Sequence, residues 1–430
     1  MIYIYKRWVM RSLLFFLLLS SVVYGQEHHP TKLDTIWWKH LDEHLKGAFR
    51  DKMGFAGNPD ETVLEHFTQL DSLNLSNTKI ISLKGLDHLL NLRVFICNDT
   101  KITTLHGLEN LTKLERLYCY NTHVSDLKSL EKLTNLKKLV CNDAKLTTLH
   151  GVEHLANLQL LNCGNNKITS LLPLQNVTNL EALICDNTLI PNLAGIENLT
   201  KLGWLICDNS PITVLSSIEN LVNLEALSIS NIKISNLQSL ARLINLTQLS
   251  CNNNKITSLA GIDSLKKLTV LNCAVTGITS LSQLENCKNL VQLTGNATKI
   301  IKLEGIENLV KLKTLVCNNT KLVDLVGIEK LNALETLNIA NTKIMNLYGM
   351  EYLLKLKSLT CNNTQIEGLD ALAKSVELEF LNCDNTNVIR LAGTEKLLKL
   401  KELVCSNLTI DYEDIKQFKK IHPMCKVSWK

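Results

Sequence analysis

Cysteine is the residue that first suggests chemistry in this 430-residue chain, which contains 14 of them. Two of them, Cys317 and Cys361, are followed by Asn-Asn-Thr, as at Cys317 to Thr320. A thiol beside amides and a hydroxyl could be a nucleophile, part of a metal site or half of a disulfide, and Asn318-Asn319-Thr320 is also a glycosylation motif. Spacing distinguishes these interpretations, because twelve cysteines are separated by multiples of 22 residues: Cys97, Cys119, Cys141, Cys163, Cys185, Cys207, Cys251, Cys273, Cys317, Cys361, Cys383 and Cys405.

The twelve cysteines occupy what we call the ladder position. A leucine, or in one case Phe95, lies two residues before each of them, which is the pattern of a short strand with one buried face. We therefore predict that they face an apolar core, where burial raises the thiol pKa and makes the thiol inert. Cys287 takes an apolar position and is also predicted to be core, whereas the redox state of Cys425 is open.

Histidine pairs suggest a second chemistry. The segments His40 to His44 and His150 to His154 both match H-x-x-E-H, a zinc-peptidase pattern in which histidines four apart share one helix face. The second match consists largely of consensus residues of the repeat, and the first falls on an expected cap helix. A short motif without its structural context is weak evidence, so a zinc metallopeptidase is only a remote hypothesis, and no cofactor or metal is expected.

The elements that must position these residues follow from the period. Steps of 22 residues from Leu75 to Cys405 give sixteen repeats without insertion or deletion, with the consensus L-x-x-L-x-C-x-N-T-K-I-x-x-L-x-G-I-E-x-L-x-x. Each repeat predicts one short strand followed by a return with an apolar residue at every third position, which favours 3₁₀ or extended turns. Because one such coil cannot bury its own apolar side, the coils must stack into a curved α/β solenoid with a parallel sheet on its concave face.

This repeat resembles the 22-residue leucine-rich repeats of bacterial internalin-like proteins, and the resemblance covers about residues 71–409. It implies a helical N-terminal cap over 26–70 and a C-terminal cap over 410–430. The chain departs from the pattern in having cysteine where leucine is usual. It also has threonine where the family has asparagine, which Asn166 and Asn254 alone retain. It carries no C-terminal wall-sorting motif, so surface anchoring is not supported.

The N-terminal segment 1–25 indicates export. Lys6, Arg7 and Arg11 precede an apolar run from Leu13 to Val23 that is too short to span a bilayer, which is typical of a secretory signal peptide. We expect a protein that is periplasmic, secreted or on the cell surface, is not membrane-spanning, and is monomeric. Removing these three basic residues lowers the balance from 46 basic and 41 acidic residues to 43 and 41, which does not favour nucleic acid as a partner.

Two charged columns also follow the period. Nine glutamates lie twelve residues after the ladder position, and nine lysines lie four residues after it: Lys79, Lys101, Lys145, Lys167, Lys233, Lys255, Lys299, Lys321 and Lys343. Stacked lysines could attract an anionic glycan or phosphate. The near-zero net charge favours the simpler interpretation of a solvated surface.

The outward-facing strand positions are where the repeat leaves residue identity free. Aromatic, apolar and basic residues gather there in the N-terminal half: Arg116, Tyr118, Tyr120, Lys138, Val140, Ile184, Trp204 and Ile206. Tyrosine, tryptophan and arginine dominate binding hot spots, whereas valine and isoleucine also simply favour strands. The sequence therefore predicts a non-enzymatic protein that binds a protein partner on its concave face. Binding of an anionic glycan or envelope polysaccharide along the lysine column is the alternative.

Overall fold

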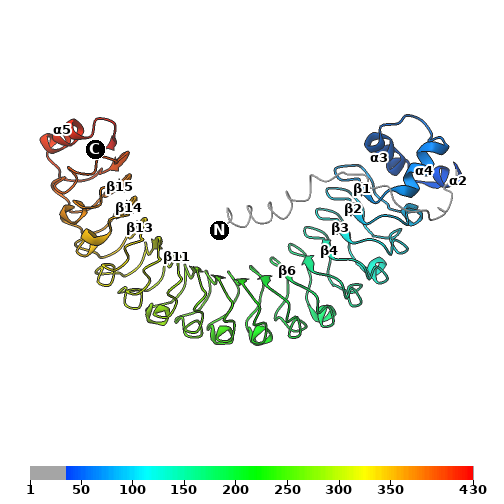
Figure 1. Ribbon diagram of the computed structural model, residues 1–430, viewed down its shortest axis with the longest axis horizontal. Coiled ribbons are helices and arrows are strands. Elements are labelled where there is room, and N and C mark those ends of the chain that lie inside the picture. The colour runs from blue at the N-terminus through cyan, green and yellow to red at the C-terminus, as the bar shows by residue number, and fades with distance from the viewer. Residues whose placement is uncertain (1–34, 430) are drawn as a thin grey trace.

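The computed structural model describes residues 35–429, and the expected signal peptide lies outside them. The chain winds into an open arc with its strands along the inner side and its turns along the outer side (Figure 1). All strands belong to one parallel sheet in which each pairs with the next along the chain. The register shift is 22 residues, as in Leu117↔Leu139, until the last pair, Leu403↔Val427. The predicted solenoid with a concave parallel sheet is confirmed.

Each strand is three residues long, and its central residue points into the core. The strands are β1 (Ser72–Asn74), β2 (Val94–Ile96), β3 (Arg116–Tyr118), β4 (Lys138–Val140), β5 (Leu160–Asn162), β6 (Ala182–Ile184), β7 (Trp204–Ile206), β8 (Ala226–Ser228), β9 (Gln248–Ser250), β10 (Val270–Asn272), β11 (Gln292–Thr294), β12 (Thr314–Val316), β13 (Thr336–Asn338), β14 (Ser358–Thr360), β15 (Phe380–Asn382), β16 (Glu402–Val404) and β17 (Lys426–Ser428).

A left-handed residue follows each strand from β1 to β16 and turns the chain out of the sheet. It lies two residues after the ladder position and has φ between 51° and 58°, as in Asn121 and Asn319. Asparagine and aspartate tolerate this conformation better than other residues with side chains, which explains their recurrence here. Val275 and Ala297 adopt it without that advantage. Asn319, the middle residue of the glycosylation motif noted in the sequence, is therefore a turn former.

The outer side of the coils has two forms. Where glycine lies ten residues after the ladder position, it has a positive φ, and in most of these coils its N–H donates to a glutamate two residues later, as from Gly107 to Glu109 at 2.7 Å. Most of the other coils form a short 3₁₀ helix, and the coils of Gly85 and Gly349 form one as well. The 3₁₀ helices are η1 (Leu86–His88), η2 (Lys128–Leu130), η3 (Leu172–Leu174), η4 (Ser216–Ile218), η5 (Gln238–Leu240), η6 (Ser282–Leu284), η7 (Met350–Tyr352) and η8 (Asp370–Leu372).

The core is one continuous apolar column that contains the cysteines. All twelve ladder cysteines and Cys287 are fully buried free thiols, as predicted. The threonine three residues after the ladder position donates its hydroxyl to the ladder residue's carbonyl oxygen, for example from Thr320 to Cys317 at 2.8 Å. The hydroxyl forms this bond while it stays buried, and the bond stabilises the turn of each coil that has this threonine.

Helices lie at both ends of the arc. Helices α2 (Thr35–His40), α3 (Glu43–Met53) and α4 (Glu61–Gln69) precede β1, and α5 (Tyr412–Ile421) precedes β17. Trp37, Trp38, Phe49 and Phe67 interlock beside the first coils, with the Phe49 and Phe67 ring centroids 4.8 Å apart. Covering the end of the sheet in this way removes exposed core and strand edge. Within residues 35–429, no helix is long and apolar enough to cross a membrane.

Candidate partner-binding surface

The concave face presents two outward residues from each strand, the first and the third. Between neighbouring coils these residues stack in register about 4.8 Å apart. Arg116 therefore lies next to Lys138, and Tyr118 next to Val140. Tyr120 follows the same strand, β3, beyond the ladder residue. We call these five residues the tyrosine group.

The other three predicted residues lie on β6 and β7. Ile184 is in register with Ile206, and Trp204 is in register with Ala182. We call Ile184, Trp204 and Ile206 the tryptophan group. The structure thus brings the eight residues together in two groups rather than one, with Leu160 and Asn162 of β5 between them. All eight are half-buried, so each offers part of its surface to solvent.

Burial sets the electrostatics of the tyrosine group. It raises the pKa of Tyr118, and it also raises the pKa of Tyr120, with a smaller contribution from Asp99. Burial, followed by the positive charge of Arg116, lowers the pKa of Lys138, while Glu181 opposes that shift. The phenols are therefore neutral at physiological pH and are available as hydrogen-bond donors beside an apolar surface.

Two carboxylates follow the strands that carry the tryptophan group, two residues after the end of β6 and of β7. Burial raises the pKa of Asp186 and of Asp208, which occupy the same position in adjacent coils. Asp208 accepts hydrogen bonds from the Ser228 hydroxyl at 2.8 Å and from the Ser230 N–H at 2.6 Å. These bonds fix the Asp208 carboxylate and make it part of the scaffold.

Sequence analysis missed a cavity of about 730 Å³ beside Trp204. It is lined by Gly203 and Trp204 and by Glu181 and Glu225 from the two flanking coils. The feature that creates the space is the missing side chain at Gly203. The consensus of the repeat does not specify a residue at this position. The only signal in the sequence was therefore a glycine, Gly203, where the two neighbouring coils have glutamate.

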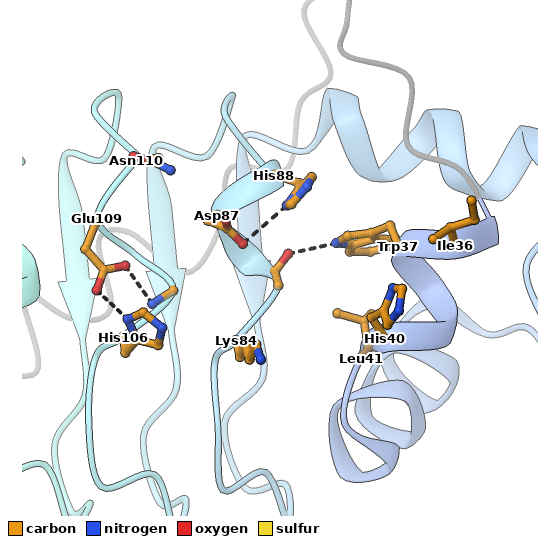
Figure 2. A pocket seen from close by; sticks show the side chains of 12 residues that line it. Ile36, Trp37, His40, Leu41, Lys84, Asp87, His88, His106, Glu109 and Asn110 are labelled. Atoms are coloured by element: carbon orange, nitrogen blue, oxygen red, sulfur yellow. Dashed lines mark hydrogen bonds and ion pairs between the residues drawn. The ribbon is translucent and has the colours of Figure 1, made fainter.

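A second cavity, of about 720 Å³, lies between α2 and the first outer turns (Figure 2). There the Trp37 indole N–H donates to the Gly85 carbonyl oxygen at 2.8 Å, and His106 Nδ1 lies 2.9 Å from a Glu109 carboxylate oxygen. Figure 2 shows that His40 comes from the helix and His106 from a turn two coils into the array.

The zinc-peptidase hypothesis assumed that His40 and His44 lie on one face of a single helix, and that assumption is wrong. Helix α2 ends at His40, and Asp42 caps the start of α3 by accepting from the His44 N–H at 2.9 Å. The two histidines therefore do not share one helix face, and Glu43 is bonded to Lys46 at 2.8 Å. Among the residues that the structure describes, no cluster of three or more histidine, cysteine or acidic side chains could hold a metal ion.

The two charged columns differ in their contacts. The glutamates beside glycine turns are bonded into the fold, like Glu109, which also accepts from the Ser129 hydroxyl at 2.8 Å. They are therefore scaffold rather than a simple solvated surface. The nine lysines of the lysine column are exposed, and none forms an ion pair within the described part of the chain.

Comparison with known proteins agrees with this architecture. The family profile described as "Leucine Rich repeats (2 copies)" matches residues 112–157 and 244–286. A leucine-rich-repeat protein of Leptospira interrogans is 24% identical with a TM-score of 0.76, over 84% of this chain and 94% of that one. An internalin of Listeria monocytogenes, InlF, is 24% identical with a TM-score of 0.59, over 84% and 94%.

A third solved structure is also described by its cysteines. It is the functional domain of InlJ from Listeria monocytogenes, which is described as including a cysteine ladder. That domain is 27% identical with a TM-score of 0.69, over 80% of this chain and 75% of that one. A search of curated protein sequences finds no match.

Proposed function

Because this chain is an internalin-like leucine-rich-repeat protein, we propose that it is an exported, non-enzymatic binding protein that holds a protein partner on its concave face. The observation that carries the proposal is the placement of Tyr118, Tyr120 and Trp204 on one preformed sheet. Aromatic side chains lose little conformational entropy on binding and supply large contact areas.

Rigidity is the second support for the proposal. Each strand is bonded to both neighbours, and every coil rests on the same buried column, so the binding residues are ordered before a partner arrives. A preformed surface avoids the entropy cost of ordering loops at the interface. The half-buried Val140, Ile184 and Ile206 extend the apolar part of the surface.

The test compares partner capture by the wild-type chain and by the double variant Tyr118→Ala/Trp204→Ala. Its matched control is Tyr348→Ala/Tyr352→Ala, which removes two aromatic residues from outside the sheet, where their exposed fractions are 75% and 54%. We expect the concave variant to lose the partner and the control to retain it. Equal recovery of the same protein by all three chains would refute the proposal.

The lysine column supports a second candidate function. Its ammonium groups are exposed and form no ion pair among the described residues, and several of them, such as Lys299, Lys321 and Lys343, come from consecutive coils. An anionic glycan could bridge several of them. This function predicts steep loss of binding as salt rises from low to physiological concentration, whereas an apolar protein site is far less sensitive. Salt-independent capture of the partner would argue against it.

A further inference from the structure

One flank of the coils carries a row of outward-facing residues, each six positions after the ladder position. In eight of the sixteen coils this residue is serine or threonine, as in Thr103 and Thr257. In three consecutive coils it is instead Ile301, Val323 and Met345, and all three side chains are exposed. The Val323 N–H donates to the Ile301 carbonyl oxygen at 3.2 Å, so these side chains project side by side from bonded backbones.

This apolar row is confined to those three coils. Thr279 precedes it, and Glu367 follows it in the next coil, where the Glu367 N–H donates to the Met345 carbonyl oxygen at 3.3 Å. Val326 and Tyr348 extend it toward the outer turns, with exposed fractions of 67% and 75%. We call the resulting surface the apolar flank: Ile301, Val323, Val326, Met345 and Tyr348.

Lysines of the lysine column run along the same flank. Lys321 and Val323 are exposed and the buried Leu322 lies between them, so both side chains point out of the same side of the coil. Lys299 and Lys343 have the same place in the coils before and after. The Lys343 N–H donates to the Leu322 carbonyl oxygen at 2.9 Å, which keeps neighbouring coils in line. The apolar flank therefore has a row of ammonium groups on the side nearer the sheet.

The acidic groups of this flank do not neutralise the lysine row. Glu304 lies 3.6 Å from Lys302, and Asp324 accepts from the Val326 N–H at 3.1 Å. The ammonium groups of the three lysines in the row bond to no residue that the structure describes. The segments that form the flank hold four basic and two acidic residues, a net charge of +2: 299–304, 321–326 and 343–348.

The composition of the flank favours a lipid surface over a protein partner. Hot spots of protein interfaces are rich in tryptophan, tyrosine and arginine, whereas valine is under-represented in them and lysine is depleted from interfaces. The apolar flank has one aromatic residue, Tyr348, and is otherwise aliphatic or methionine, with lysine beside it. Exposed apolar side chains bordered by lysines are typical of surfaces that lie on anionic bilayers, where the apolar groups enter the acyl boundary and the ammonium groups meet the phosphates.

We propose that the apolar flank and the three lysines beside it dock the protein on the surface of a membrane that contains anionic lipids. The flank joins the inner sheet to the outer turns, so contact through it leaves the concave face of the arc open (Figure 1). The proposal therefore goes beyond the proposed function and uses a different surface of the array. The charge that the lysines lack within the chain is supplied by the lipid headgroups.

The experiment measures co-sedimentation of the purified chain with lipid vesicles. It uses residues 26–430, which include every residue that the structure describes and leave out the apolar run from Leu13 to Val23. The vesicles contain phosphatidylcholine alone or phosphatidylcholine with phosphatidylglycerol. We expect partitioning onto the anionic vesicles to be at least about tenfold stronger, because each lysine near such a surface contributes about fivefold.

Two matched substitutions test the apolar row. Val323→Thr/Met345→Thr introduces a residue that other coils have at this position, and we expect it to weaken partitioning at least about tenfold. The control, Val222→Thr/Ile244→Thr, also removes two exposed apolar residues from consecutive coils, but away from the lysine column. The exposed fractions are 39% and 52% for the test pair and 38% and 55% for the control pair. The control should bind as wild type does.

Two further substitutions test the lysines. Lys321→Gln/Lys343→Gln removes two charges beside the apolar row, and we expect it to weaken partitioning more than about tenfold. Lys233→Gln/Lys255→Gln removes two charges from the same column, in coils where serine or threonine takes the place of the apolar residue. This second pair should change partitioning less than about twofold.

Several outcomes would overturn the membrane site. They are equal partitioning onto both kinds of vesicle, an equal loss from Val222→Thr/Ile244→Thr, and an equal loss from both lysine pairs with none from Val323→Thr/Met345→Thr, which would indicate attraction of any polyanion. If Val323→Thr/Met345→Thr binds vesicles normally but loses a soluble protein partner, the flank is a protein site. Thermal unfolding checks that each variant is folded. Partner capture on the concave face is measured without lipid, so either proposal can fail alone.

Discussion

The side-chain oxygen of Asn166 accepts a hydrogen bond from the backbone N–H of Leu146, one coil earlier, at 3.0 Å. The Asn166 amide also donates to the Cys141 carbonyl oxygen of that earlier coil at 3.0 Å. Asn254 occupies the equivalent position, and its amide donates to the Ile229 carbonyl oxygen at 2.7 Å. The side-chain oxygen of Asn254, however, is buried without a partner among the described residues.

This difference predicts that replacing asparagine by threonine lowers the free energy of unfolding more at Asn166 than at Asn254. Asn166→Thr introduces the residue that most coils use, but it removes the bonds to the neighbouring coil and leaves the Leu146 N–H unsatisfied. We expect it to lower the free energy of unfolding by about 1–3 kcal/mol. Asn254→Thr also removes an orphan oxygen, so its cost should be about 1 kcal/mol smaller. Denaturant midpoints of the two variants measure the difference, and equal midpoints would contradict it.

The repeat allowed much of this fold to be predicted from sequence. The alternation of buried and exposed positions around Cys317 correctly predicted that its thiol lies in the core. Features that depend on backbone angles or on the next coil were not predictable in the same way. The left-handed conformation of Asn319 and the bonding of Glu109 to Gly107 became visible only with coordinates.

The candidate site shows the same limit. Outward strand positions such as Tyr118 and Trp204 could be identified because alternation fixes which face a residue takes. The cavity beside Trp204 could not be predicted, because it lies where one coil has glycine, Gly203, in place of a longer side chain. Charge pairing across coils depends on side-chain conformations, which a repeat pattern does not specify.

Acid should weaken the array partly through Glu109. Burial opposes ionisation of this carboxylate, but bonds from its own N–H, the Ser129 hydroxyl, the Gly107 N–H and His106 outweigh burial and lower its pKa to about 2. A lowered folded-state pKa stabilises the fold above the ordinary value of 4.5, and the stabilisation is lost as pH falls toward 2. Glu109→Gln should therefore be less stable than wild type at pH 6 and should lose less further stability on acidification.

Thermal midpoints between pH 6 and pH 2.5, at fixed ionic strength, measure this prediction. Glu131→Gln is the matched control, because Glu131 lies at the same position one coil later, where Ser129 replaces the glycine. If the two variants show the same change of midpoint with pH, the loss of one negative charge explains the effect and the bonds of Glu109 do not.

The ladder thiols should be inert in the native protein. Burial raises the pKa of Cys317 to about 12, and the other ladder cysteines are buried in the same column. Cys425 is the cysteine with partial exposure. At pH 8 we expect a thiol reagent such as Ellman's reagent to modify Cys425 alone within minutes, and all 14 cysteines after denaturation. Cys425→Ser should have no rapidly reacting thiol, and rapid labelling of that variant would contradict the burial of the ladder.

Two glycines in the array predict opposite effects of one substitution. Gly295 takes the ladder position of its coil, has an ordinary φ, and leaves room for a Cβ 3.5 Å from Ile300 and 3.7 Å from the Cys273 sulfur. Gly295→Ala removes freedom from the unfolded chain and adds a buried methyl group. We expect the free energy of unfolding to rise by about 0.5–1.5 kcal/mol.

Gly107→Ala is the counterpart. Gly107 has φ +108°, and a Cβ there would overlap the carbonyl oxygen of Leu83 in the preceding coil. The left-handed φ and this overlap with backbone atoms both disfavour a side chain, so we expect a loss of about 2 kcal/mol or more. Denaturant unfolding of both variants, with wild type alongside, measures the two signs. If Gly295→Ala destabilises the chain, the ladder is already fully packed at that coil, and the space beside Cys273 is needed for the neighbouring side chains.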